Sequence, residues 1–220
     1  MMVMLLKNVR IRSSYFAYSH LTAIIRSSLG GDVLTDYLNT VLETKGVQVR
    51  PSHAFKKRVH GDKFEVSPME TPNMTTSYHR FHHRELVRDV KDSLCRVSES
   101  AFDETTLASI PTVSYELPDG QTVELGAERF QVAEALFAPQ ILNNSAYNER
   151  QSLPQMVVAC ASSCETDIRK ELYHNLIVTG GGSLFGNLPE RLAHELHQLV
   201  AQVCVVILSN TIIVFINAKS

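Results

Sequence analysis

The feature that most constrains the fold is a run of three glycines between an apolar segment and an amphipathic one. It lies within residues 176–199, LIVTGGGSLFGNLPERLAHELHQL. The β-branched start predicts a strand, and the following leucines share one helical face: Leu188, Leu192, Leu196 and Leu199. Glycines allow positive φ and leave the backbone open to a neighbouring group. Strand, glycine turn and helix together favour phosphate or nucleotide binding, with a ligand-free tight turn as the alternative.

Two common nucleotide motifs fit this segment poorly. A P-loop ends in Gly-Lys-Ser/Thr, and no lysine lies between residues 177 and 199. A relaxed dinucleotide motif could use Gly180, Gly182 and Gly186, but it needs an acidic residue at the end of the next strand. The next strand-like run, residues 203–208, is followed by serine and asparagine. Neither motif is therefore predicted.

The composition is that of a soluble globular protein with one or two domains. The 220 residues are 44% hydrophobic and 20% charged, and the net charge of −2 predicts no global attraction to nucleic acid or anionic lipid. The apolar run 203–216 is shorter than the ~20 residues that span a bilayer, so two buried strands with a turn at residues 209–210 are expected instead. The four cysteines are scattered without a C-x-x-C pair, which favours reduced intracellular thiols.

Local patterns predict an α/β chain. Helices are expected over residues 32–45, 84–97, 132–137, 153–162 and 167–173, with a hairpin of 114–117 and 121–125 around Pro118-Asp119-Gly120. Residues 47–80 show little apolar periodicity and are expected to form a surface loop or insertion. This stretch carries the basic cluster Lys56, Lys57 and Arg58.

Residue spacing supports no metal or catalytic site. His194 and His197 are i, i+3 apart, whereas the zincin helix needs i, i+4 and a third ligand. His79, His82 and His83 form a second cluster. All five of these histidines are expected to be solvated surface side chains. No Ser/His/Asp or Cys/His set can be assembled. Taken alone, the charged residues 88–92 are typical of a solvated helix face.

Four segments, taken in order, resemble actin and its relatives. They are GGDVLTDYL (30–38), RELVRDVKDSLC (84–95), YELPDGQTVELGAERFQVAEALF (115–137) and the stretch 164–196. Their order and gaps are similar to those of the family, and the resemblance covers about residues 16–199. It implies an α/β, actin-like (ribonuclease H-like) ATPase fold, mainly the second large lobe and incomplete.

Three other stretches resemble the actin-related subunit of SWI/SNF (BAF)-type chromatin remodellers. They are the insertion 47–80 and the runs 96–120 and 18–32. The expected organisation is an unmatched segment 1–15, a partial actin-like domain 16–199 and an unmatched apolar tail 200–220. We favour a truncated or aberrantly spliced start over a transit peptide, because family-like sequence begins near Phe16.

The resemblance also implies nucleotide-binding residues. Arg88, Lys91 and Asp92 match positions that approach adenine and ribose, where Asp92 replaces the glutamate of actin. Gly180, Gly181 and Gly182 match the adenosine loop. Leu184 and Phe185 match its apolar and aromatic positions, and Phe185 lacks the hydroxyl of the tyrosine in actin. No catalytic or metal-ligating residue is predicted.

The resulting functional hypothesis is a non-catalytic scaffold subunit of a nuclear chromatin-remodelling complex, acting in transcription regulation. The resemblance implies two partners, actin or another actin-related protein and a helical segment of a remodeller motor subunit. It implies neither membrane attachment nor direct sequence-specific nucleic-acid binding. Full-length family members bind ATP or ADP with Mg²⁺, but nothing here resembles their Asp-Gly phosphate loops, so at most a partial adenine-nucleotide cleft and no ATPase activity are expected. The alternative is a cytoskeletal actin-like ATP-binding protein.

Overall fold

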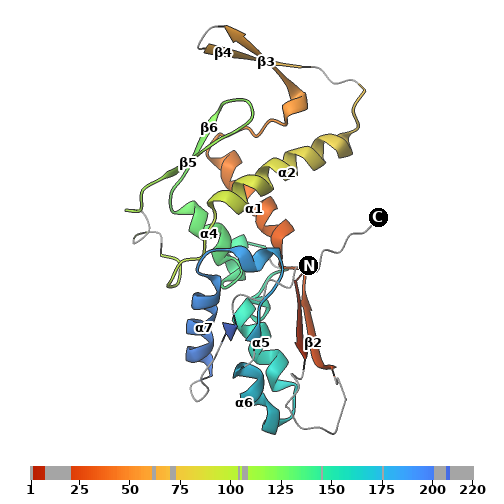
Figure 1. The fold of residues 1–220 in the computed structure, drawn as a ribbon, viewed down its shortest axis with the longest axis vertical. Coiled ribbons are helices and arrows are strands. Elements are labelled where there is room, and N and C mark those ends of the chain that lie inside the picture. Colours follow the sequence, from red (N-terminus) through yellow and green to blue (C-terminus); the bar gives the residue numbers. More distant parts are fainter. Residues whose placement is uncertain are drawn as a thin grey trace. The chain divides into compact units, whose positions relative to one another are not determined.

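A computed structural model describes residues 2–7, 21–60, 63–69, 73–103, 105, 109–144, 146–174, 176–200 and 207–208. These residues form helices and small sheets, which confirms the predicted α/β class (Figure 1). The chain divides into two compact units. Unit 1 comprises Met1–Val33, Arg96–Ala101 and Ala133–Ser220, and unit 2 comprises Leu34–Cys95 and Phe102–Val132.

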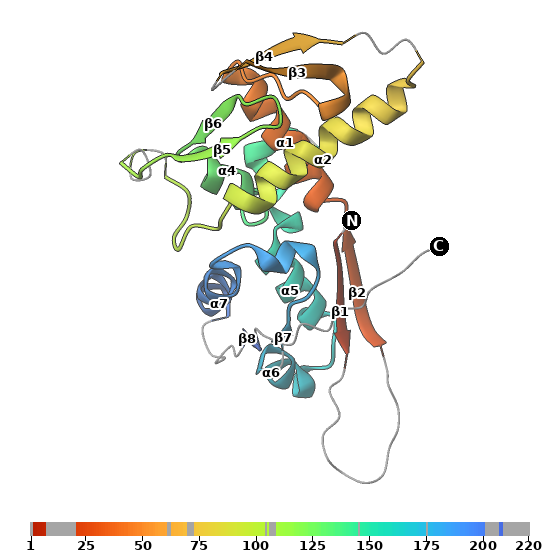
Figure 2. The same cartoon turned by 45° about the horizontal axis from the view of Figure 1, so that its top comes forward.

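Two crossing helices form the centre of unit 2. Helix α1 (Gly31–Thr44) ends before Gly46, whose φ of +76° stops it as predicted. Helix α2 (Thr76–Leu94) packs its second half against α1 in both views (Figures 1 and 2). The buried apolar residues repeat at helical spacing on each helix: Leu34, Leu38 and Leu42 on α1, and Val87, Val90 and Leu94 on α2.

The predicted hairpin is present as β5 (Val113–Glu116) and β6 (Thr122–Leu125), which pair antiparallel. The next helix, α4 (Glu128–Glu134), begins four residues before the predicted start at residue 132. One side chain explains the early start, since the Glu128 carboxylate accepts the Gly126 N–H at 2.9 Å. Burial alone would raise the pKa of Glu128, but this bond and the Lys45 ammonium at 2.5 Å outweigh it and lower the pKa.

The expectation of a loop over residues 47–80 is wrong for most of its length. The 3₁₀ turn η1 (Ser52–Ala54) leads into an antiparallel hairpin of β3 (Phe55–His60) and β4 (Lys63–Pro68). The side chains of residues 56–58 are all exposed, so the hairpin lacks the alternation of a half-buried strand. Helix α2 begins at Thr76, eight residues before the predicted start, because the Thr75 hydroxyl caps it by accepting the Tyr78 N–H at 3.3 Å.

Unit 1 contains the other predicted helices. Helices α5 (Leu153–Ser162) and α6 (Thr166–His174) agree with expectation, and α5 lies beside the antiparallel hairpin of β1 (Met2–Lys7) and β2 (Leu21–Ser27) (Figure 2). Short 3₁₀ turns, η2 (Pro139–Leu142) and η3 (Glu149–Gln151), precede α5. Strand β7 (Leu176–Ile177) pairs in parallel with β8 (Ile207–Leu208). The turn predicted at residues 209–210 lies outside the described residues.

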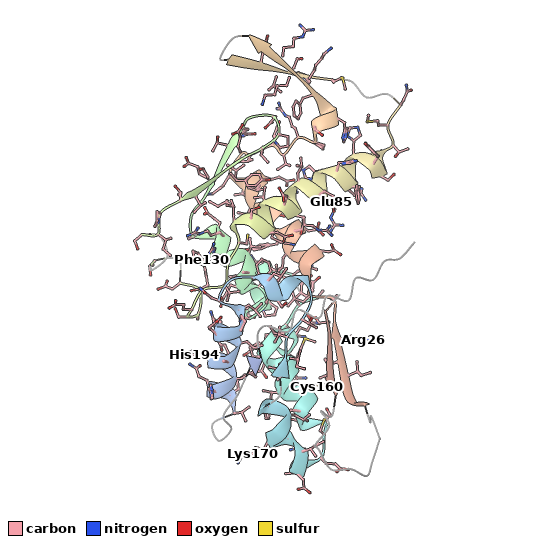
Figure 3. All side chains as sticks on the ribbon, viewed as in Figure 1. Arg26, Glu85, Phe130, Cys160, Lys170 and His194 are labelled. Carbon is pink, nitrogen blue, oxygen red and sulfur yellow. The ribbon has the colours of Figure 1, made fainter. Side chains whose placement is uncertain are left out.

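Three of the four cysteines lie in the described part of the chain. Cys95, Cys160 and Cys164 are buried and form no disulfide among the described residues, and their predicted reduced state stays a prediction; Cys160 is labelled on α5 in Figure 3. Burial raises the pKa of Cys95 to about 12. Within the described ranges, no helix combines the length and apolarity that a membrane span requires.

Candidate functional site

The predicted nucleotide residues divide between the two units. Arg88, Lys91 and Asp92 lie on α2 in unit 2, whereas the glycine segment lies between β7 and α7 (Leu188–Leu199) in unit 1. Each half is therefore described by itself.

On α2, two of the three predicted residues face solvent. Arg88 is half exposed and its guanidinium pairs with Glu85 at 2.8 Å, one turn earlier (Glu85 is labelled in Figure 3). The Asp92 side chain is 62% exposed. Both groups are accessible to a polar ligand, although such a ligand would compete with Glu85 for Arg88.

Lys91 lies on the inner side of the same helix. Its side chain is only 6% exposed, and the ammonium donates to the Thr35 hydroxyl on α1 at 3.1 Å and lies 3.4 Å from Asp92. A buried ammonium is retained only where hydrogen bonds and opposite charge offset its lost hydration. The geometry therefore gives Lys91 a role in joining the two helices. The predicted contact with adenine remains a prediction.

The glycine segment is an open backbone loop. Gly180 has φ +104° and ψ 170°, a conformation that is essentially restricted to glycine. A Cβ added at Gly180, Gly181 or Gly182 would meet no atom within 4 Å. The 3₁₀ turn η4 (Gly181–Leu184) follows, closed by the Ser183 N–H and hydroxyl, which both donate to the Gly180 carbonyl. Only Gly180 requires glycine for its own conformation, and all three leave space for another group.

The two apolar residues after the glycines have opposite environments. Leu184 is 77% exposed, whereas Phe185 is only 7% exposed and belongs to the core of unit 1. No feature of the sequence indicates which of the two side chains is buried. Phe185 therefore serves packing in this structure, and its predicted ring contact with a base remains a prediction.

Backbone hydrogen bonds hold the end of the loop in place. The Gly186 carbonyl accepts the Val97 N–H at 3.0 Å, and the Asn187 side-chain amide donates to the Val97 carbonyl at 3.4 Å. Asn187 adopts the left-handed conformation (φ +67°) immediately before α7. The segment Arg96–Ala101 thus holds the entry into α7.

The buried Arg191, which sequence reasoning missed, also holds the entry into α7. Its guanidinium forms a bidentate ion pair with the Glu134 carboxylate (3.2 and 3.0 Å), and its Nε lies 2.8 Å from the Glu195 carboxylate. It also donates to the carbonyls of Ser98 (3.1 Å) and Ser100. Only 2% of the side chain is exposed. The available signal was that Arg191 lies between Leu188 and Leu192, on the apolar face of α7.

The histidines near the start of α2 are less exposed than predicted. His53 from η1 lies against His79 and His82, and its Nε2 is 2.9 Å from His79 Nδ1. Burial lowers the pKa of His53, and the two neighbouring histidines lower it further. Across the described ranges, no three His, Cys, Asp or Glu side chains are grouped so that they could hold a metal ion.

An adenine nucleotide fits this set of residues only in part. In unit 2, the exposed Arg88 and Asp92 could contact a polar ligand. In unit 1, the glycine backbone is open to a neighbouring group. Lys91 is already hydrogen-bonded inside unit 2, and Phe185 is buried. No step of phosphate chemistry follows from these residues.

Comparison with known proteins gives two consistent results. The family model described as Actin matches residues 18–214. Among curated proteins, Actin-related protein 4 of Arabidopsis thaliana is 42% identical over 183 residues, and that of Oryza sativa subsp. japonica is 41% identical over 181 residues. Each alignment covers 79% of this chain, but only 42% and 41% of the relative.

A more distant relative is named for its complexes. The SWI/SNF and RSC complexes subunit arp42 of Schizosaccharomyces pombe is 28% identical over 198 residues, which are 80% of this chain and 46% of that protein. The chain thus spans less than half the length of the curated relatives it matches.

Proposed function

This chain belongs to the actin family, and we propose that it is a non-catalytic actin-related subunit of a nuclear chromatin-remodelling complex. The observation that carries the proposal is the similarity to two Actin-related protein 4 sequences and to a named SWI/SNF and RSC subunit. The sequence of residues 47–80 supports the proposal too, because it resembles the longer basic insertion of the remodeller subunit rather than the short loop of conventional actin.

A scaffold role agrees with what the described residues provide. Arg191, Glu134 and the carbonyls of residues 98 and 100 fix the entry into α7 without any ligand. In unit 2, the Lys91–Thr35 bond and the Arg84–Asp36 pair at 3.1 Å join α1 and α2 in the same way. These contacts stabilise the fold of each unit by itself.

For nucleotide, we propose at most a partial adenosine contact. The candidate groups are Arg88 and Asp92 in unit 2 and, taken separately, the backbone of Gly180–Gly182 in unit 1. A bound nucleotide would supply the phosphoryl group, but the charge-neutralising groups that phosphoryl transfer needs are not among these residues. Calorimetry with Mg-ATP is therefore expected to give no heat of binding at about micromolar affinity. Clear binding that Arg88→Ala removes would favour the alternative, a cytoskeletal actin-like ATP-binding protein.

The proposed partners are actin or another actin-related protein, and a helical segment of the remodeller motor subunit. Family members of this kind would bind such a helix in an apolar groove. The direct test is a pulldown of the purified 220-residue chain by an immobilised motor-subunit helix, with and without actin. Retention above a scrambled-helix control is expected, and its absence under both conditions would count against a scaffold role for this chain.

A further inference from the structure

The outer face of the first half of α2 is apolar although it faces solvent. Tyr78 and Phe81, three residues apart on one face of the helix, are 44% and 59% exposed. They lie opposite the face that packs on α1 through Val87 and Val90. Met69 and Met74, just before the helix, are 45% and 39% exposed. These four residues are half of the large exposed apolar side chains in the described part of the chain.

Basic side chains lie beside this apolar face. Residues 56–58 of β3 are exposed lysines and arginine. The two elements are joined, because His53, which precedes β3, contacts the Tyr78 ring at 5.0 Å and the Met69 N–H donates to the Ala54 carbonyl at 2.9 Å. We call the apolar residues 69, 74, 78 and 81 together with the basic residues 56–58 the α2–β3 surface.

The charge of this region is opposite to that of the rest of the chain. Residues 45–84 contain eight lysines and arginines against three acidic residues, whereas the remainder contains thirteen against twenty. Two nearby acids are already opposed by a basic partner: Asp36 pairs with Arg84 and Glu85 with Arg88. A third, Glu65, lies directly opposite Arg58 across the hairpin. The surface is therefore complementary to a negatively charged partner.

We propose that the α2–β3 surface binds an acidic amphipathic segment of a partner protein. The apolar side chains of that segment would cover Tyr78 and Phe81, and its carboxylates would face the lysines of β3. Tyrosine, phenylalanine, methionine and arginine are among the residue types enriched in protein interfaces. A nucleic-acid backbone would match the charge, but its phosphates would leave the exposed apolar residues uncovered, so a protein segment is favoured.

The test uses the whole chain and a labelled helical peptide of about 20 residues, with leucine and phenylalanine on one face and glutamate on the other. Fluorescence anisotropy should show saturable binding. Phe81→Ser, and separately Lys56→Glu with Lys57→Glu, should each weaken it about tenfold, the effect of losing one strong interface residue. Leu199→Ser, at a site that is 44% exposed in unit 1, and Arg150→Glu, at an exposed site, should leave it unchanged.

Three results would overturn the proposal. These are no saturable binding to the unmodified chain, equal binding by the Phe81→Ser variant, and equal binding of a peptide whose glutamates are replaced by glutamine. A short DNA duplex that binds more tightly than the peptide, through the lysines and without Phe81, would instead identify a nucleic-acid surface. Unchanged thermal unfolding of each variant shows that a loss of binding does not come from a loss of folding.

Discussion

Replacing Arg191 with alanine should destabilise the protein more than any surface substitution. The change removes the bidentate ion pair with Glu134, whose side chain is only 3% exposed, and the hydrogen bonds to the carbonyls of Ser98 and Ser100. It removes the stacking of the guanidinium on the Phe137 ring, at 4.9 Å. Breaking a buried pair by removing one partner costs about 3–5 kcal/mol. At about 2–4 °C per kcal/mol for a chain of this size, Tm should fall by roughly 6–20 °C.

The assay is urea and thermal unfolding followed by circular dichroism. Arg150→Ala is the matched control, because Arg150 is exposed and should change the unfolding free energy by less than about 0.5 kcal/mol. The double variant Arg191→Met with Glu134→Leu should recover most of the loss, since it removes both buried charges. A cost below about 1 kcal/mol for Arg191→Ala, the value of an exposed ion pair, would refute the assignment of this network as the anchor of α7.

Three further outcomes follow from single side chains. Lys91→Met should lower the unfolding free energy by about 1–3 kcal/mol, whereas Arg88→Met should change it by less than about 0.5 kcal/mol; equal effects in urea unfolding would contradict the buried role of Lys91. The pKa of Glu128 is lowered in the folded chain, so its carboxylate stabilises the fold above the ordinary pKa of 4.5, and this stabilisation is lost as the pH falls below that value. In the Glu128→Gln variant, Tm should therefore decrease less steeply as the pH is lowered. Cys95, with its pKa raised to about 12 by burial, should resist iodoacetamide in the folded chain and react once it is unfolded in urea, as followed by peptide mass spectrometry.

The sequence was most informative where an apolar face is buried. Helices α1, α5 and α6 were predicted almost to the residue, because their leucines, valines and small residues repeat at helical spacing. The hairpin β3–β4 and the first turns of α2 gave no such signal. Their side chains are mostly polar or exposed, so no apolar periodicity marks these elements in the sequence.

The candidate site shows the same limit at the level of single residues. The glycine loop was foreseen, because a positive φ at Gly180 calls for glycine. The burial of Lys91 and Phe185 was not, because neighbouring positions on a helix or turn differ in exposure only through what packs on them. Arg191 was missed for a related reason, since its partner Glu134 is 57 residues away and no local rule pairs them.

The proposal of a nuclear remodelling subunit is tested most directly by quantitative affinity purification of the tagged 220-residue chain from nuclear and cytoplasmic extracts. The tag alone provides the background. The account predicts enrichment of a remodeller motor subunit together with actin or another actin-related protein in the nuclear sample. Enrichment of filament proteins from the cytoplasm, with no motor subunit above background in the nucleus, would contradict it.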